Sequence, residues 1–385
     1  MTQGDKPQKN ALILSGGGAR AAYQVGVLKA LAEILPENAR NPFPIICGTS
    51  AGAINAVTLA AHEGNFRDGV AELERIWFSL EPGDVYRYGW LEMAHGVGRV
   101  ALSLLNQGVG VSRPIALLDN APLRELIQRS VKFHQIDRAI ARGDLEAVSI
   151  TAMGYTSGRS VAFFQGNPEL KGWQRYRRIG RPTLLNIDHL MASSAIPALF
   201  PTTKIEHEYF GDGALRQLAP ISPALHMGAD RVFIIGVSGN RAPHMRKPPR
   251  ARHSPSIAGV IGHLLNSAFV DSLESDIEHL DRVNQLLHLI PEDQRRANGI
   301  PLRPIESLVI WPSEQVERIA GRKVRYLPAS LRALLRSTGA TARGGGGTAA
   351  SYLLFAKPFI EEMIQLGYRD AMWEEESLRG FFLGS

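Results

Sequence analysis

The order of apolar and polar positions predicts alternating strands and helices in the first part of the chain. The apolar run Ala11–Leu14 predicts a buried strand, and residues 21–31 carry apolar side chains at helical spacing. The stretch Pro44–Ala60 repeats this order, with a short apolar run, a glycine-containing turn and a helix. Such an order is typical of an α/β protein with an open, mostly parallel sheet.

Later segments follow the same two patterns. A turn at 156–158 separates two strands and predicts a hairpin or adjacent strands, and prolines make the apolar run 195–201 an irregular loop. Helical spacing predicts helices over residues 123–131, 187–194, 257–287 and 352–366, and apolar runs predict strands over 147–153, 161–164, 208–214, 231–237 and 307–311.

The segment from Glu63 to Arg129 is predicted to be helical and follows the helix that ends near Ala60. It contains an aromatic cluster, Tyr86, Tyr88 and Trp90, followed by several apolar residues. Two interpretations remain open. The segment is either a lid or interfacial contact for a lipid, or an ordinary amphipathic helix that covers the sheet.

Composition places the chain among globular proteins with a large core, since 44% of its 385 residues are hydrophobic and 21% are charged. We expect a polar tail over residues 1–10, a catalytic domain over 11–240, and a basic loop with a mainly helical region over 241–385, packed on the same sheet. The first ten residues lack the apolar core of a secretory signal, and no apolar run is long enough to span a bilayer. A cytoplasmic location, with or without peripheral membrane contact, is the expectation.

Charge and cysteine content exclude several classes of site. The single cysteine, Cys47, excludes an internal disulfide and a cysteine-based metal cluster. The formal charge of +6 favours anionic surfaces but does not indicate a nucleic-acid partner. Five basic residues and three prolines gather in Arg241–Arg252, which is either a solvated linker or a contact for anionic phospholipid headgroups.

The sequence Gly48-Thr49-Ser50-Ala51-Gly52 joins the second predicted strand to its helix. In a G-x-S-x-G turn, glycines leave room for a strained backbone that lifts the serine hydroxyl clear of the sheet, at a helix N-terminus where negative charge is favoured. Ser50 is therefore the candidate nucleophile. The alternative is a purely structural turn from strand to helix.

A second glycine loop, Ser15-Gly16-Gly17-Gly18-Ala19-Arg20, follows the first predicted strand. Its N–H groups, at a helix N-terminus, form an anion site for a phosphate or for a reaction oxyanion. A dinucleotide site needs an acidic residue at the end of the next strand, whereas Cys47 and the serine turn stand there. We therefore favour an oxyanion site, with Gly17 and Gly18 as donors.

A serine hydroxyl needs a base, and Asp212 is our candidate. It lies on a glycine turn, Gly211-Asp212-Gly213, after a predicted strand. None of the eleven histidines lies in a local motif that marks it as a base. A Ser–Asp pair is the economical alternative, because a carboxylate kept from water gains basicity.

Four blocks together resemble the patatin-like phospholipases: the glycine loop, the serine turn, the run from Ser194 to Pro201, and Asp212-Gly213-Ala214. The resemblance spans roughly residues 11–225 and implies a three-layer α/β/α fold and a lipid acyl hydrolase without metal or cofactor. It also implies Ser50 as nucleophile, Asp212 as base and the loop Gly16, Gly17 and Gly18 as oxyanion hole. Ala21 and Ala214 stand where the family often has glycine.

The resemblance implies a phospholipid or lysophospholipid substrate, cleaved through an acyl-enzyme. Arg20 has two interpretations, because it either binds the lipid phosphate or pairs with a carboxylate beside the loop. Two other functions remain open: a nucleotide-binding module that uses the glycine loop, and a catalytically silent protein that binds membrane surfaces through the basic loop and the aromatic segment.

Overall fold

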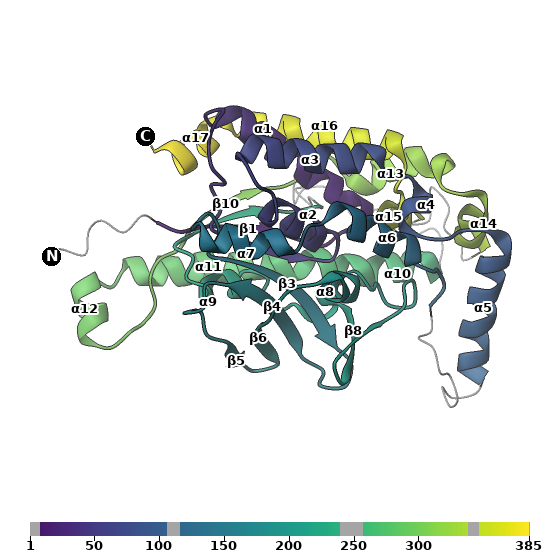
Figure 1. The fold of residues 1–385 in the computed structure, drawn as a ribbon, viewed down its shortest axis with the longest axis horizontal. Helices are drawn as coiled ribbons and strands as arrows, with labels where there is room; N and C mark the ends of the chain where they lie inside the picture. Colours follow the sequence, from purple (N-terminus) through teal and green to yellow (C-terminus); the bar gives the residue numbers. More distant parts are fainter. Residues whose placement is uncertain (1–7, 106–115, 239–256, 338–345, 385) are drawn as a thin grey trace, which may run out of the picture.

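The computed structural model describes residues 8–105, 116–238, 257–337 and 346–384. Within these residues one ten-stranded sheet lies between helices on both of its faces (Figure 1). The first two strands are β1 (Asn10–Leu14) and β2 (Ile45–Thr49), which pair in parallel with Ile13 opposite Cys47. The predicted strand–helix alternation at the start of the chain is thus confirmed.

The parallel part of the sheet runs in the order β10-β9-β1-β2-β3. Beyond β3 the sheet becomes mixed, because β4 and β8 both pair antiparallel with β3. The smaller strands β5, β6 and β7 extend this mixed side, and the sequence patterns did not predict them. The remaining bounds are β3 (Ala147–Gly154), β4 (Ser160–Gly166), β5 (Trp173–Arg175), β6 (Arg178–Pro182), β7 (Thr203–Ile205), β8 (Glu208–Asp212), β9 (Arg231–Ile235) and β10 (Glu306–Ile310).

Alternate side chains of the central strands enter two different cores. Leu12 and Leu14 of β1 point into the larger core, whereas Ala11 and Ile13 point into the smaller one. Because successive side chains of a strand face opposite sides, a strand that is apolar throughout must be covered twice. The predicted three-layer α/β/α fold is confirmed.

The larger core is closed by α1 (Ala22–Ile34), α3 (Phe66–Ser79) and α16 (Lys357–Trp373), which lie together above the sheet in Figure 1. Helices α1 and α16 cross in close contact, since a Cβ on Gly26 would lie 1.9 Å from the Ile364 carbonyl oxygen. The other elements on or near this side are α2 (Ala51–Ala60), α4 (Pro82–Val85), α6 (Ala121–Ser130), α7 (His134–Ala141), α8 (Ile187–Ser193), α13 (Val316–Lys323), α14 (Ala329–Ser337), α15 (Gly346–Leu353), α17 (Glu375–Leu383) and the short helices η1 (Gly18–Ala21) and η4 (Val324–Tyr326).

The smaller core lies under α9 (Ser222–His226) and α11 (Ser272–His288), on the other face of the sheet (Figure 1). Helix α11 continues α10 (Ile257–Asn266) through a π-helical turn, η3 (Ser267–Asp271), so the predicted long helical segment 257–287 is confirmed. Two further short helices are η2 (Gly213–Arg216) and α12 (Glu292–Ala297). Among the described helices, none combines the length and the apolar character needed to cross a bilayer.

One predicted helix is wrong, and so is one of the two interpretations of the aromatic segment. The predicted helix 352–366 is interrupted at residues 354–356, because α15 ends at Leu353 and α16 starts afresh with Pro358 in its first turn. The aromatic segment does not cover the sheet: its helix α5 (Trp90–Leu105) extends away from the body of the molecule (Figure 1). The basic stretch Arg241–Arg252 and the start of the glycine run at 343–347 lie outside the described residues.

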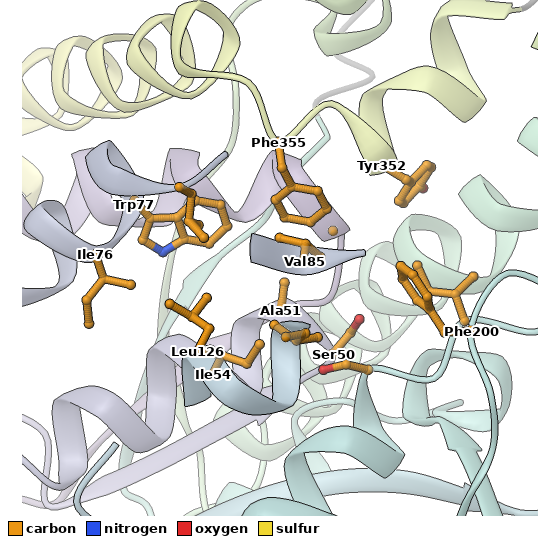
Figure 2. A pocket seen from close by; sticks show the side chains of 15 residues that line it. Ser50, Ala51, Ile54, Ile76, Trp77, Val85, Leu126, Phe200, Tyr352 and Phe355 are labelled. Atoms are coloured by element: carbon orange, nitrogen blue, oxygen red, sulfur yellow. The ribbon is translucent and has the colours of Figure 1, made fainter. Parts of the chain in front are cut away.

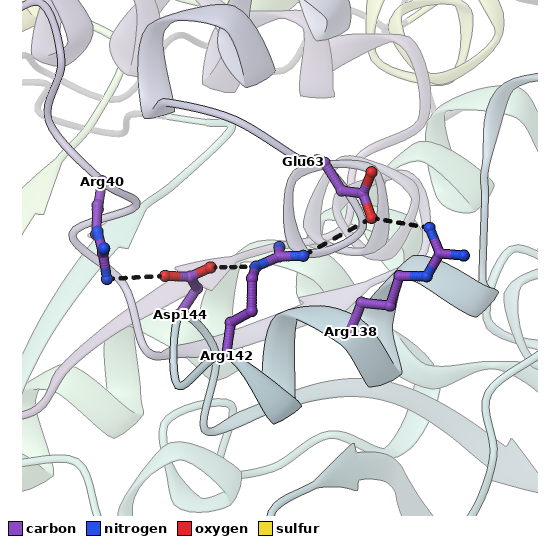
Figure 3. A network of polar contacts seen from close by, with 5 residues as sticks. All are labelled: Arg40, Glu63, Arg138, Arg142 and Asp144. Atoms are coloured by element: carbon purple, nitrogen blue, oxygen red, sulfur yellow. Dashed lines mark hydrogen bonds and ion pairs between the residues drawn. The ribbon is translucent and has the colours of Figure 1, made fainter.

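A chain of exposed ion pairs connects three loops at one edge of the larger core (Figure 3). Asp144 pairs with Arg40 and Arg142, and Glu63 pairs with Arg142 and Arg138, at distances of 2.7 to 3.7 Å. Exposed pairs of this kind contribute about 1 kcal/mol or less each. These ion pairs therefore neutralise surface charge more than they stabilise the fold.

Candidate active site

Ser50 lies at the turn from β2 to α2, above the C-terminal edge of the parallel strands. Its backbone is strained, with φ 56° and ψ −130°, a conformation that L residues with side chains rarely adopt. The chain reverses there within one residue, so the Ser50 side chain is lifted away from the strand. The strained turn predicted from the G-x-S-x-G spacing is thus present at Ser50.

The two glycines of the turn are required by close packing. A Cβ on Gly48 would lie 2.5 Å from the Ala53 Cα atom in α2, and one on Gly52 would lie 2.4 Å from the Leu14 carbonyl oxygen at the end of β1. Neither contact is tolerable for any other residue. The G-x-S-x-G spacing thus lets α2 pack against the two strands that it adjoins.

Asp212 ends β8 and is fully buried. Its backbone N–H donates to the Ala195 carbonyl oxygen at 3.0 Å, and its Oδ1 accepts the Ala214 N–H at 3.0 Å. The first of these bonds ties β8 to the irregular loop 195–201, because Ala195 is the first residue of that loop. The four sequence blocks therefore meet at one place, because the end of β8 lies against β3 beside the serine turn.

Burial raises the pKa of Asp212 from 3.8 to about 7, while hydrogen bonding from the Ser50 hydroxyl and the Ala214 N–H lowers it. The second carboxylate oxygen, Oδ2, is buried and has no partner with good hydrogen-bond geometry among the described residues. The contact with Ser50 is therefore looser than a well-formed hydrogen bond, as acid–base pairs often are before substrate binds. A carboxylate that titrates near neutral pH is suited to act as a base.

Tyr155 lies near this carboxylate. Its ring rests against Gly211, the residue before Asp212, and the side chain is 44% exposed. Burial and the neighbouring Asp212 charge raise the pKa of the Tyr155 hydroxyl. Sequence reasoning did not single out this residue.

The glycine loop lies directly beside the serine. A Cβ on Gly16 would lie 2.9 Å from the Ser50 Cβ, so the two backbones are in contact. Gly18 has a φ of 56° and lies against the Tyr352 carbonyl oxygen, which would be 2.2 Å from an added Cβ. Gly17 precedes η1 at the C-terminal end of β1. The loop thus places the start of helix η1 near the Ser50 side chain.

The buried Ser193 hydroxyl and Gln217 side-chain amide form hydrogen bonds to the serine turn. The Ser193 Oγ accepts the Ser50 N–H at 2.8 Å and donates to the Thr151 carbonyl oxygen at 2.6 Å. The Gln217 amide accepts from the Thr49 hydroxyl at 2.6 Å and donates to the Thr151 hydroxyl at 3.1 Å. These contacts fix both flanks of the strained residue. No local motif marks Ser193 or Gln217, since they lie 143 and 168 residues away from their partners in the turn.

Ser50 opens into a pocket lined by side chains from several helices and loops (Figure 2). The pocket is almost wholly apolar, and the lining residues that carry hydroxyls are Ser50, Ser194 and Tyr352. The Ser194 Oγ is buried without a hydrogen-bond partner among the described residues. The apolar lining comes from Ala51, Ile54, Ile76, Trp77, Leu80, Val85, Leu123, Leu126, Ile196, Phe200, Tyr352 and Phe355.

Arg20 is fully buried and does not line this pocket. Its Nε donates to the Ser351 Oγ at 2.7 Å, an Nη pairs with Glu317 at 3.2 Å, and its guanidinium stacks over the Tyr352 ring at 4.1 Å. These contacts agree with the interpretation in which Arg20 pairs with a carboxylate beside the loop. They also fix α15 onto the glycine loop.

Cys47 has the role of a core residue, as expected. It is buried on β2, and burial raises the pKa of its thiol to about 12. Among the described residues, no three His, Cys, Asp or Glu side chains come together as metal ligands would.

The profile described as "Patatin-like phospholipase" matches residues 12–225, more than half of the chain. That range contains the glycine loop, the serine turn and Asp212. The chain belongs to the patatin-like phospholipase family.

Two curated relatives share this region. The chain is 28% identical over 221 residues to a "cGAMP-activated phospholipase" of Escherichia coli, a match that covers 55% of this chain and 53% of the relative. A protein of the same name from Pseudomonas aeruginosa is also 28% identical over 221 residues, covering 57% of this chain and 56% of the relative. The match thus spans about half the length of these curated relatives.

Among solved structures, human GIVD cytosolic phospholipase A2 aligns with 98% of this patatin-like chain and 60% of its own. The TM-score is 0.36 and the identity 12%.

Proposed function

We propose that this patatin-like protein is a lipid acyl hydrolase in which Ser50 is the nucleophile and Asp212 its base. One observation carries the proposal: a fully buried carboxylate whose pKa is raised to about 7 adjoins a strained serine at an apolar pocket. A structural turn needs neither the pocket nor the perturbed carboxylate.

In the first step, the Ser50 hydroxyl attacks the carbonyl carbon of an ester and passes its proton to Asp212. Negative charge then develops on the carbonyl oxygen. The N–H groups of Gly16, Gly17 and Gly18 start a helix beside Ser50, where they are suited to stabilise that oxygen. When the intermediate collapses, the alcohol leaves with the proton held by Asp212, and the acyl group stays on Ser50.

In the second step, Asp212 takes a proton from water, which attacks the acyl-enzyme and releases the fatty acid. The proton returns to the Ser50 oxygen as it leaves. Among the described residues that line the pocket, Tyr352 is the titratable one, and burial raises its pKa to about 12. Asp212 does not line the pocket, but it lies beside the Ser50 hydroxyl and its pKa is about 7. This is why we give both proton transfers to the one aspartate.

The pocket supports an acyl chain as the group bound beside Ser50. Its lining is aliphatic and aromatic, so a hydrocarbon chain could move from water into the pocket without leaving polar groups of the lining unpaired. The curated relatives are named as phospholipases, which favours phospholipids or lysophospholipids among acyl esters.

The test is release of fatty acid from phosphatidylcholine and from lysophosphatidylcholine. We expect turnover by the wild type and a loss of at least about a thousandfold in Ser50→Ala, because the covalent route is removed. Ser377→Ala, the same change on α17, is the matched control and should keep full activity. Equal rates in wild type and Ser50→Ala would refute the proposal.

Nucleotide binding on the glycine loop is the weaker alternative. The loop is packed against Phe269, Val237 and Tyr352, so a pyrophosphate would have to displace these side chains. The relatives are named as cGAMP-activated, however, and an activator need not bind that loop. We therefore include cGAMP in the assay, where a rise in fatty-acid release would add a nucleotide activator to the proposed activity.

A further inference from the structure

Helix α5 has a wide apolar face that no described part of the molecule covers. Trp90, Leu91, Val97 and Leu102 are 64%, 75%, 43% and 56% exposed. At 3.6 residues per turn these four side chains span about 140° of the helix surface. A water-exposed helix normally turns such a face inward, so its exposure indicates an interaction surface.

The opposite side of α5 is what holds it to the protein. Among its described side chains, only Met93 and Gly96 are buried. Gly96 lies against the Leu117 carbonyl oxygen, where an added Cβ would be 2.2 Å away. This contact fixes the helix by one edge and leaves Trp90 and Leu91 directed away from it.

The base of α5 is built into the rim of the pocket. Tyr86, just before the helix, is buried and donates its hydroxyl to the Leu353 carbonyl oxygen at 2.7 Å. Its ring packs against Phe200 and Phe355, which both line the pocket. On the other side, the Leu118 N–H donates to the Leu199 carbonyl oxygen at 2.9 Å, one residue before Phe200. The segments on either side of α5 are therefore tied to residues that line or adjoin the pocket in which we place the acyl chain.

Charge near the base of α5 fits an anionic surface. Ser330 of α14 donates its hydroxyl to the Tyr88 carbonyl oxygen, which places α14 beside the start of α5 (Figure 1). Helix α14 contains Arg332 and Arg336 and no acidic residue. An apolar helix face with a tryptophan at one end and arginines close by is the pattern of a helix that lies in the interface of a bilayer.

We propose that α5 docks the protein on a phospholipid bilayer, inserting Trp90, Leu91, Val97 and Leu102 among the lipids and bringing the pocket mouth to the surface. This inference rests on the proposed lipid hydrolase function for its choice of partner. Binding itself needs no hydrolysis, so it is measured in the Ser50→Ala background.

The experiment is sedimentation with vesicles of phosphatidylcholine containing a minority of phosphatidylglycerol. Trp90→Glu and Leu91→Glu should each weaken binding at least about tenfold, because an inserted apolar side chain becomes a charge. Trp373→Glu is the matched control, since Trp373 is 81% exposed and ends α16 next to α17, which lies far from α5 (Figure 1). It should bind as Ser50→Ala does.

A second readout is the rate of hydrolysis of vesicle lipid divided by that of a water-soluble short-chain ester, with Ser50 intact. Trp90→Glu should lower this ratio at least about tenfold, and Trp373→Glu should not change it. Absence of vesicle binding by Ser50→Ala, or equal effects of the two tryptophan variants, would overturn the inference. So would a concentration-dependent dimer that Trp90→Glu abolishes, because α5 would then join two copies of the chain. If the wild type hydrolysed neither substrate, that result would count against the proposed Ser50–Asp212 dyad instead.

Discussion

The Asp212→Asn substitution tests the buried carboxylate most sharply when stability is followed against pH. Asparagine has the size of aspartate, and its oxygen can still accept the Ala214 N–H. It cannot ionise. The difference in unfolding free energy between wild type and variant therefore reports the cost of the Asp212 charge in the folded protein.

The sign and the magnitude follow from the pKa. Because the folded-state pKa of Asp212 is raised from 3.8 to about 7, the neutral carboxyl stabilises the fold relative to the charged form. This stabilisation is fully present below about pH 4 and is lost as pH rises through about 7. A shift of about three pKa units corresponds to about 4 kcal/mol, of which about 3 kcal/mol falls between pH 5 and pH 8.

The assay is urea unfolding of both proteins, followed by circular dichroism at a series of pH values. We expect the variant to gain stability over the wild type by about 3 kcal/mol from pH 5 to pH 8. At the same time, the wild-type kcat/KM for a soluble ester should rise with pH and level off above about 7, since the base must be ionised. A stability difference that stays constant over this range would refute the raised pKa, and with it the reason for assigning Asp212 as the base.

Three other predictions concern the surroundings of the site. Ser193→Ala leaves the Ser50 N–H without its acceptor, so it should lower the rate at which an active-site-directed phosphonate labels Ser50 and cost about 1–3 kcal/mol in urea unfolding. An unchanged labelling rate would show that Ser193 does not position the turn. Leu126→Trp should fill the pocket and lower kcat/KM for a long-chain ester about tenfold or more relative to a butyryl ester, whereas an equal effect on both would place the acyl chain elsewhere. Asp144→Ala breaks two exposed ion pairs and should change the unfolding free energy by about 1 kcal/mol or less, with no effect on turnover; a larger loss of stability would contradict our view of that surface.

Much of the site could be predicted from the sequence because its key features are local. The turn at Ser50 is visible through Gly48 and Gly52, two residues on either side, and the structure shows why each must be glycine. The strand before Asp212 and the helix start after Gly17 were recognisable for the same reason. The apolar run Ala11–Leu14 was enough to predict a buried strand, and the resemblance to the patatin-like phospholipases implied the three-layer fold.

What could not be predicted depends on contacts between distant segments. Ser193 meets the turn from 143 residues away, and Arg20 is buried by α15, more than 300 residues further along the chain. The helical pattern of residues 352–366 gave no sign that Leu354–Ala356 would be extended, although Pro358 is typical of a helix start. Whether the apolar face of α5 packs inward also depends on tertiary structure, and its sequence reads as an ordinary amphipathic helix.

Labelling with a fluorophosphonate probe tests the central claim most directly, because the probe reports an activated serine without assuming a substrate. We expect the wild type to be labelled at Ser50, and both Ser50→Ala and Asp212→Asn to lose labelling while their circular dichroism spectra stay unchanged. Labelling that persists in folded Ser50→Ala, or a folded wild type that is not labelled, would contradict the assignment of Ser50 and Asp212 as a catalytic pair.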